Sequence, residues 1–186
     1  MSTVLIAWEL GGGLGHLMRL KPVVGGLVRR GYRVVVVVQN VVQARRVFGG
    51  ADITILPAPV GALPAHKHVK LIRSYGHILH NSGFGDRETL AALLASWRSL
   101  YKLIEPDLVI CDHSPTALLA LRGRTTKRLC IGTGFCCPSP ETPFRDLRPE
   151  APCEEGQLEQ EESQLLQTVN ATLGDISMRR LDRLSD

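Results

Sequence analysis

A glycine-rich tract that ends in a histidine offers the clearest chemistry in this sequence of 186 residues. Residues 11–16 read Gly-Gly-Gly-Leu-Gly-His and come directly after the apolar residues 4–8. Glycines let a chain turn sharply after a strand, and they let another molecule approach the N-terminus of the following helix. Because imidazole gains and loses its proton near neutral pH, His16 is a candidate general base.

An imidazole base needs its second nitrogen to be held by a partner, usually a carboxylate. Asp112 is the candidate, since it ends the apolar segment 107–112. The partial positive charge at a helix N-terminus favours the neutral imidazole. The carboxyl ends of parallel strands meet at one edge of a sheet, so His16 and Asp112 are expected to lie close together. The alternative, that each residue only caps the helix that follows it, stays open.

The rest of the chain alternates between strand and helix patterns, which would position these residues. The valine run 34–38 is typical of a central parallel strand, and residues 57–68 and 133–156 are proline-rich and predicted to be irregular. The alternation predicts an α/β fold, a doubly wound and mostly parallel sheet of the Rossmann-like kind. Strands are predicted at residues 4–8, 32–39, 52–56, 107–112 and 128–132, and helices at 14–30, 41–48, 69–81, 86–104, 115–122, 158–173 and 178–184.

Composition excludes several classes of function. The net charge is only +4, the basic residues are scattered and aromatic residues make up 5% of the chain, which argues against nucleic-acid binding. The longest aliphatic run is far too short to span a membrane, and no signal sequence is visible. The five cysteines have neither disulfide nor metal spacing, as expected of reduced thiols in a cytoplasmic protein.

Other interpretations of the glycine tract fit less well. A dinucleotide fold would have a third glycine where this chain has His16, and an acidic residue where it has Gln39 and Asn40. The lysine and hydroxyl residue of a phosphate-binding P-loop are absent. The histidine pairs 66/68 and 77/80 have metal-like spacing, but no cysteine or carboxylate cluster completes either pair, so no metal site and no cofactor are predicted.

Four segments together resemble the N-terminal half of GT-B-fold glycosyltransferases that use nucleotide sugars, a group with the natural-product transferases and the peptidoglycan lipid-intermediate transferase. The segments are residues 11–16, 27–34, 106–112 and 132–135, and the similarity covers essentially the whole chain. The resemblance implies that His16 deprotonates an acceptor hydroxyl and that Asp112 supports it. It also implies that residues 60–85 line the acceptor pocket, which makes His77 and His80 candidates for contact with the acceptor.

The carboxyl ends of the predicted strands supply the other candidates for substrate binding. Together with His77, these are Gly12, Gly13, His113, Thr133, Gly134 and Phe135.

The resemblance further implies a division of the chain and a missing partner. Residues 1–150 would form the acceptor-binding domain, and residues 151–186 a helical segment leading to a donor-binding domain that this sequence lacks. The nucleotide sugar would bind mainly there, as a substrate. The acceptor would be a small molecule or a lipid-linked molecule, and a donor-domain chain or a second copy would cover the exposed cleft wall. A non-catalytic binding or regulatory module and an NAD(P)-binding oxidoreductase fragment remain as alternatives.

Overall fold

The computed structural model describes residues 1–61 and 63–186. The chain folds as two compact units, each made of two segments. Unit 1 contains Met1–Val60 and Leu94–Gly132, and unit 2 contains Gly61–Leu93 and Thr133–Asp186. The boundary at residue 150, expected from the sequence between a domain body and a segment leading to a further domain, remains a prediction.

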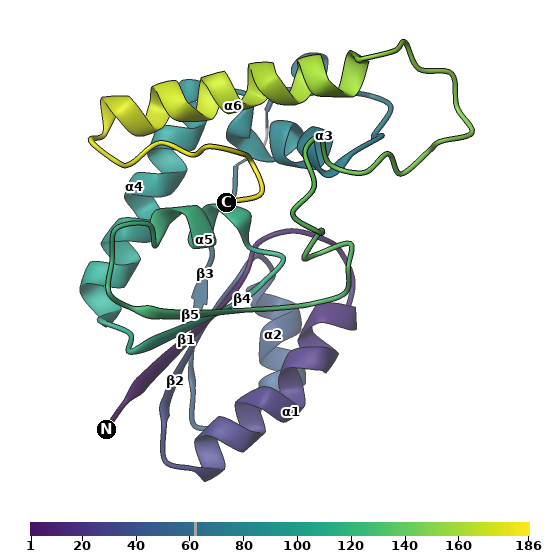
Figure 1. The fold of residues 1–186 in the computed structure, drawn as a ribbon. Coiled ribbons are helices and arrows are strands. Elements are labelled where there is room, and N and C mark those ends of the chain that lie inside the picture. The colour runs from purple at the N-terminus through teal and green to yellow at the C-terminus, as the bar shows by residue number, and fades with distance from the viewer. Residues whose placement is uncertain (62) are drawn as a thin grey trace. The chain divides into compact units, whose positions relative to one another are not determined.

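Unit 1 is built on a five-stranded sheet in which every strand pair is parallel (Figure 1). The strand order is β3-β2-β1-β4-β5, so β1 is central and β4 lies beside it. The Rossmann-like fold predicted from the sequence is confirmed. The strands are β1 (Thr3–Trp8), β2 (Arg33–Val38), β3 (Thr54–Pro57), β4 (Leu108–Asp112) and β5 (Lys127–Ile131).

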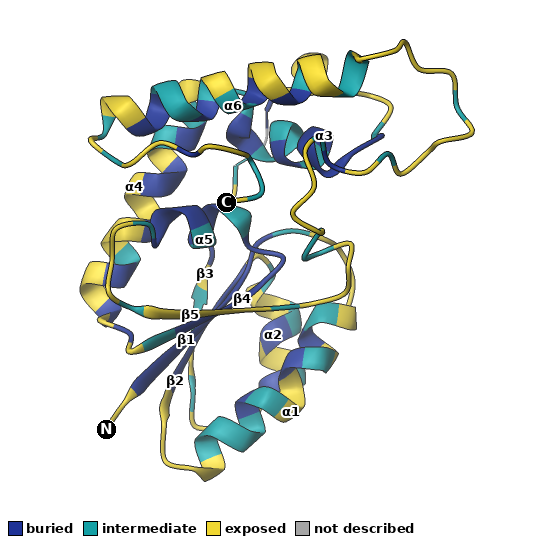
Figure 2. Ribbon diagram, viewed as in Figure 1, coloured by how far each residue is buried: buried dark blue, intermediate teal, exposed yellow. Residues whose placement is uncertain are grey.

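Helices cover both faces of the central strands, which explains their continuous apolar sequences (Figure 2). Helices α1 (Gly15–Arg29) and α2 (Val41–Phe48) pack on the face that carries Ile6 and Trp8. The other face is covered by α5 (Pro115–Ala120) and by the C-terminal half of α4 (Arg87–Ile104) (Figure 1). These two helices are joined by the hydroxyl of Tyr101, which donates a 2.8 Å hydrogen bond to the carbonyl of Ala117.

Strands β3 and β5 are the two edges of the sheet, and β5 is the more exposed of the two. Residues 127–130 are exposed, and the Leu129 side chain is 50% accessible. The sequence of β5 is also less apolar, with Lys127 and Arg128 at its start. Charged residues on an edge strand oppose pairing with other chains.

Unit 2 consists of short helical elements packed on one long helix. It contains a 3-10 turn η1 (Ala65–Lys67), helix α3 (Tyr75–Leu79) continued by a π-helical turn η2 (His80–Phe84), and α6 (Gln157–Asp175). It also includes the first turns of α4, where the Asp86 carboxylate caps the helix by accepting the backbone N–H of Thr89 at 2.9 Å. Among the described residues, no helix has both the length and the apolar character needed to cross a membrane.

Two predicted helical segments of unit 2 are wrong, for the same physical reason. Residues 69–74 do not extend α3, because the side-chain amide of Asn81 pairs with both backbone groups of Val69, at 2.9 and 3.0 Å. Residues 178–184 are not helical either, because Asn170 pairs in the same way with Leu181, at 2.7 and 2.9 Å. A side-chain amide that occupies both backbone groups of a residue competes with helix formation there.

Candidate active site

The glycine tract joins β1 to α1, and its first glycine makes room for the histidine ring. Gly11 has φ +88°, and a Cβ built on it would lie 2.6 Å from His16 Nε2. Gly13 has φ +80°, so it too needs the conformational freedom of glycine. The side-chain amide of Gln39, at the end of β2, donates to the Gly11 carbonyl and fixes the turn. Residue 11 therefore has to be glycine for the His16 ring to occupy this place.

His16 is paired with Asp112, as the sequence predicts. In the register of the sheet, Trp8 at the end of β1 lies opposite Asp112 at the end of β4. His16 Nδ1 lies 3.0 Å from Asp112 Oδ1, the carboxylate is fully buried, and the His16 side chain is 12% exposed. Because a carboxylate only accepts, Nδ1–H is the donor, and in the neutral ring the lone pair is on Nε2, beside Gly11.

Arg19, one turn further along α1, places a positive charge beside this pair. Its guanidinium lies 3.6 Å from Asp112 Oδ1 and 3.3 Å from His16 Nδ1. Since a guanidinium can only donate and Nδ1 already directs its proton to Oδ1, Arg19 interacts with this pair mainly through its ion pair with the Asp112 carboxylate. Arg19 was not among the residues predicted from the sequence. Its spacing of three residues from His16 on one helix face was the available signal.

The His16 ring is also held between two other rings. Its centroid lies 5.4 Å from that of Trp8 and 5.9 Å from that of His113, with interplanar angles of 20° and 21°. His113 is buried, and its backbone carbonyl accepts the N–H of Leu10 at 3.0 Å. Burial, and then repulsion from the His16 ring when that ring is protonated, lower the pKa of His113, so its ring stays neutral at physiological pH. The expected contact of His113 with substrate remains a prediction.

Glu9, at the end of β1, supports the same region from inside the unit. Its carboxylate accepts the indole N–H of Trp97 and the backbone N–H groups of Thr116 and Ala117, the latter two at 2.9 and 3.3 Å. Burial raises the pKa of Glu9 to about 8, although these three donors oppose the shift. Glu9 therefore caps α5, the helix that follows Asp112 and His113, since the Ser114 side chain at its N-terminus forms no capping hydrogen bond.

The remaining candidates at strand ends are exposed. Gly12 and Gly13 lie in the turn after β1, and a Cβ on either would contact nothing. Thr133, Gly134 and Phe135 form a turn in unit 2, where the Thr133 carbonyl accepts two backbone N–H groups, both at 2.9 Å. Their expected role in substrate binding remains a prediction.

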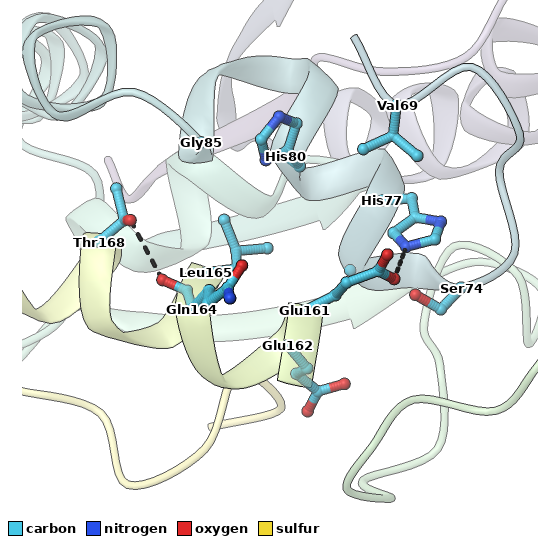
Figure 3. A pocket seen from close by; sticks show the side chains of 11 residues that line it. Val69, Ser74, His77, His80, Gly85, Glu161, Glu162, Gln164, Leu165 and Thr168 are labelled. Carbon is cyan, nitrogen blue, oxygen red and sulfur yellow. Dashed lines mark hydrogen bonds and ion pairs between the residues drawn. The ribbon is translucent and has the colours of Figure 1, made fainter. Parts of the chain in front are cut away.

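His77 lies in unit 2, in the wall of a cavity of about 350 Å³ between α3, η2 and α6. Its Nδ1 accepts the backbone N–H of Arg73 at 3.0 Å, so Nε2 carries the proton and donates to Glu161 at 2.7 Å. Figure 3 shows the Glu161 carboxylate turned toward His77. Burial opposes the ionisation of Glu161, but hydrogen bonds from Gln157 and His77 outweigh it and lower the pKa of this carboxyl.

The surface of the cavity wall is mainly apolar, and several polar side chains project from it. Such a mixture is typical of a site that fixes the orientation of a small ligand. The lining residues include Val69, Ser74, His77, His80, Glu161, Leu165 and Thr168.

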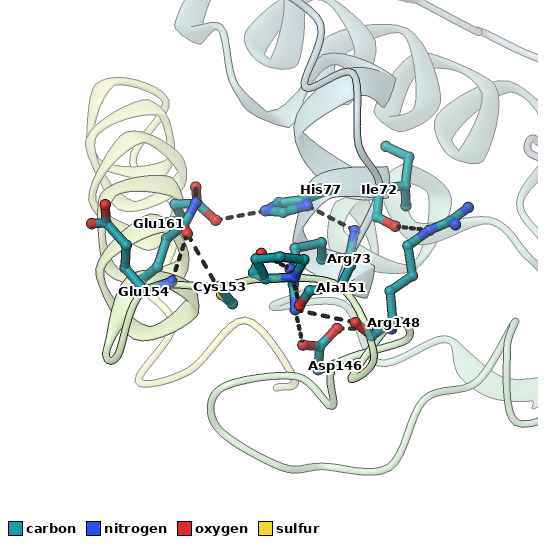
Figure 4. Close-up of polar contacts among 11 residues, drawn as sticks. Ile72, Arg73, His77, Asp146, Arg148, Ala151, Cys153, Glu154 and Glu161 are labelled. Atoms are coloured by element: carbon teal, nitrogen blue, oxygen red, sulfur yellow. Dashed lines mark hydrogen bonds and ion pairs between the residues drawn. The ribbon is translucent and has the colours of Figure 1, made fainter.

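Next to this cavity, Arg73 holds the irregular segment that precedes α6. Its buried guanidinium donates to the carbonyls of Arg148, Ala151 and Pro152 and forms an ion pair with Asp146 (Figure 4). The Arg148 side chain returns a hydrogen bond to the carbonyl of Ile72 at 3.0 Å. These contacts order a stretch that the sequence analysis predicted to be irregular.

Comparison with known proteins identifies structures with a similar fold. No protein-family model and no curated protein sequence matches this chain. Among solved structures, the kitacinnamycin glycotransferase is similar with a TM-score of 0.57 and 16% identity, over 97% of this chain and 42% of that one. The glycosyltransferase SsfS6 of Streptomyces sp. SF2575 is similar with a TM-score of 0.51 and 14% identity, over 97% of this chain and 48% of that one. The glycosyltransferase VinC, solved in complex with dTDP, is similar with a TM-score of 0.50 and 13% identity, over 98% of this chain and 46% of that one.

These likenesses establish the fold. The chain has the architecture of part of a GT-B glycosyltransferase, and it spans less than half the length of these three structures.

Proposed function

We propose that this chain is the acceptor-binding part of a glycosyltransferase that moves a sugar from a nucleotide-sugar donor to an acceptor hydroxyl. The observation that carries the proposal is the His16–Asp112 pair, in which Nδ1–H is bound by a buried carboxylate and Nε2 has a free lone pair beside Gly11. A base of this kind, oriented by a carboxylate, is what activation of a weak hydroxyl nucleophile requires.

In the proposed reaction, His16 Nε2 takes the proton of the acceptor hydroxyl while its oxygen attacks the anomeric carbon of the donor. A new carbon–oxygen bond forms there, and the bond to the nucleotide phosphate breaks with its electron pair on the phosphate. Asp112 stabilises the imidazolium that forms and keeps the ring in the reactive tautomer. Trp8 and His113 hold the ring plane between them, which limits its rotation.

The donor enters this proposal as a substrate bound mainly outside the chain. The chain spans less than half of the glycosyltransferases it matches. A donor-binding domain, in a longer form of the protein or in a separate chain, would complete the site, and a small or lipid-linked acceptor would bind to this part. Gly12, Gly13, His77, His113 and the turn 133–135 are the proposed acceptor contacts.

The test is a transfer assay on the chain assembled with a donor-binding domain, with nucleotide sugars as donors and hydroxyl compounds as acceptors. His16→Gln is expected to lower kcat by about 100- to 10,000-fold, the usual contribution of a general base. Asp112→Asn, which removes the partner of the base, is expected to lower it by about 10- to 100-fold. Lys21→Gln, an exposed change on the same helix, is the matched control and leaves kcat unchanged.

Equal turnover by the wild type and His16→Gln would contradict the proposed role of His16. Acceptor binding without turnover in the assembled protein would instead identify a binding or regulatory module. The nicotinamide alternative is tested by the fluorescence of NAD(P)H mixed with the chain. We expect no change, because Gln39 is bonded to the Gly11 carbonyl where a dinucleotide fold places an acidic residue for the ribose.

A further inference from the structure

The charge of this protein is divided very unevenly between its two units. Unit 1 contains 13 Lys and Arg but only 5 Asp and Glu, whereas unit 2 contains 9 and 13. The formal charges are +8 and −4, which add up to the +4 of the whole chain. Two of the five acidic residues of unit 1, Glu9 and Asp112, are buried, so the surface of this unit is strongly basic.

The basic residues of unit 1 gather at one edge of its sheet. In a parallel sheet the helices end, and the strands begin, at the edge opposite the carboxyl ends of the strands (Figure 1). Ten of the thirteen basic residues lie in these connections, within residues 29–33, 45–46, 102 and 122–128. The exposed acidic residues there are Asp52, Glu105 and Asp107. This basic edge therefore has a formal excess of seven positive charges and faces away from His16.

Local roles explain only part of this charge. Basic residues in the last turns of α1 and α2, and Lys102 in α4, suit the helix dipoles. Lys127 and Arg128 begin β5, and Arg33 begins β2. A strand has no large dipole that these charges could stabilise. None of these three strand residues forms an ion pair with the described residues.

Exposed apolar side chains are interspersed with these charges. Leu103, next to Lys102 at the end of α4, is 79% exposed, and Leu129 on β5 is 50% exposed. Tyr32, between α1 and β2, is 39% exposed. A leucine that is nearly as accessible as in an unfolded chain contributes nothing to the core of this unit. It would gain free energy if another apolar surface or layer buried it.

We propose that the basic edge of unit 1 docks on an anionic lipid surface. The cations would lie at the headgroups, and Leu103 and Tyr32 would enter the interface between headgroups and acyl chains. A lipid surface fits better than a nucleic acid, because an exposed leucine gains nothing against phosphates and the edge has no row of aromatic rings for stacking bases. This inference does not depend on the proposed transferase activity.

The experiment is co-sedimentation of the full chain with vesicles. One set contains phosphatidylcholine with about one third phosphatidylglycerol, and the other phosphatidylcholine alone. We expect binding only to the anionic vesicles in about 0.1 M salt and its loss in about 1 M salt. The double variant Lys127→Gln/Arg128→Gln is expected to bind about 25-fold more weakly, at about fivefold for each lost cation.

Two further variants separate the edge from general charge effects. Arg145→Gln/Arg179→Gln removes the same charge from exposed positions of unit 2 and is expected to bind like the wild type. Leu103→Ser removes an exposed apolar side chain and is expected to bind about five- to tenfold more weakly, with an unchanged salt dependence.

Any of three results would overturn the proposal. The first is a lack of binding to anionic vesicles at low salt. The second is an equal loss in the two double variants, which would show that only the net charge matters. The third is tight binding of a DNA or RNA oligonucleotide by the same edge, with no vesicle binding, which would identify a nucleic-acid surface instead.

Discussion

Replacing the buried carboxylate of Glu9 with an amide tests the electrostatics of unit 1. Burial raises the pKa of Glu9 from 4.5 to about 8, so the folded state holds a proton that the unfolded state releases near pH 4.5. Since the folded state then binds more protons, the free energy of unfolding must fall as the pH rises between these two values. This stabilising contribution is fully present below about pH 4.5 and is lost as the pH rises through about 8.

The magnitude follows from the size of the pKa shift. One pKa unit corresponds to about 1.4 kcal/mol, so Glu9 should lower the free energy of unfolding by about 3 kcal/mol between about pH 5 and pH 8. Glu9→Gln has no titrating group at this position and should lack this slope. It should also carry a constant penalty of about 1–3 kcal/mol, because an amide N–H would face the donors of Trp97, Thr116 or Ala117.

Urea unfolding followed by tryptophan fluorescence measures this difference directly. The chain has two tryptophans, Trp8 and Trp97, and both are buried in unit 1, so the signal reports that unit. Glu155→Gln, an exposed change in unit 2, is the control and should keep the wild-type pH dependence. Parallel curves for the wild type and Glu9→Gln would refute the argument, because they would mean that Glu9 is ionised in both states throughout this range.

Two other substitutions test the loop and the buried arginine. Gly11→Ala should displace the His16 ring, because the new Cβ would lie 2.6 Å from Nε2 and residue 11 has φ +88°. The signals of the His16 ring in NMR spectra should therefore move. Gly15→Ala is the control and should leave these signals in place, because nothing lies near its Cβ. Arg73→Met should release the segment before α6 and destabilise unit 2, because three backbone carbonyls and the Asp146 carboxylate lose their donor. Faster tryptic cleavage after the exposed Arg145 in the native protein would report this release, and an unchanged cleavage rate would contradict it.

The fold was predictable because its signals are local and repeated. The valines of β2 and the glycine tract after β1 define a strand and a strand-to-helix turn without any tertiary information. The pairing of His16 with Asp112 followed from a topological rule, which places the ends of parallel strands at one edge. Neither inference required knowledge of side-chain packing.

The features that sequence reasoning missed depend on contacts between distant residues. Asn81 and Asn170 end helical patterns by binding the backbone of Val69 and Leu181, which propensity scales do not describe. The role of Glu9 as the cap of α5 joins residues more than a hundred positions apart. These hydrogen bonds give Glu9 a structural role.

Because all five strands run in the same direction, the proposed active site and the basic edge lie at opposite ends of the sheet in unit 1. Strand β1 has six residues, and at about 3.3 Å per residue it separates the two ends of the sheet by roughly 20 Å. If the basic edge rests on a bilayer, the imidazole at the other end points into the aqueous phase. A hydroxyl buried among acyl chains would then be out of reach, whereas a dissolved acceptor, or one carried on a long polar tether, would arrive unhindered.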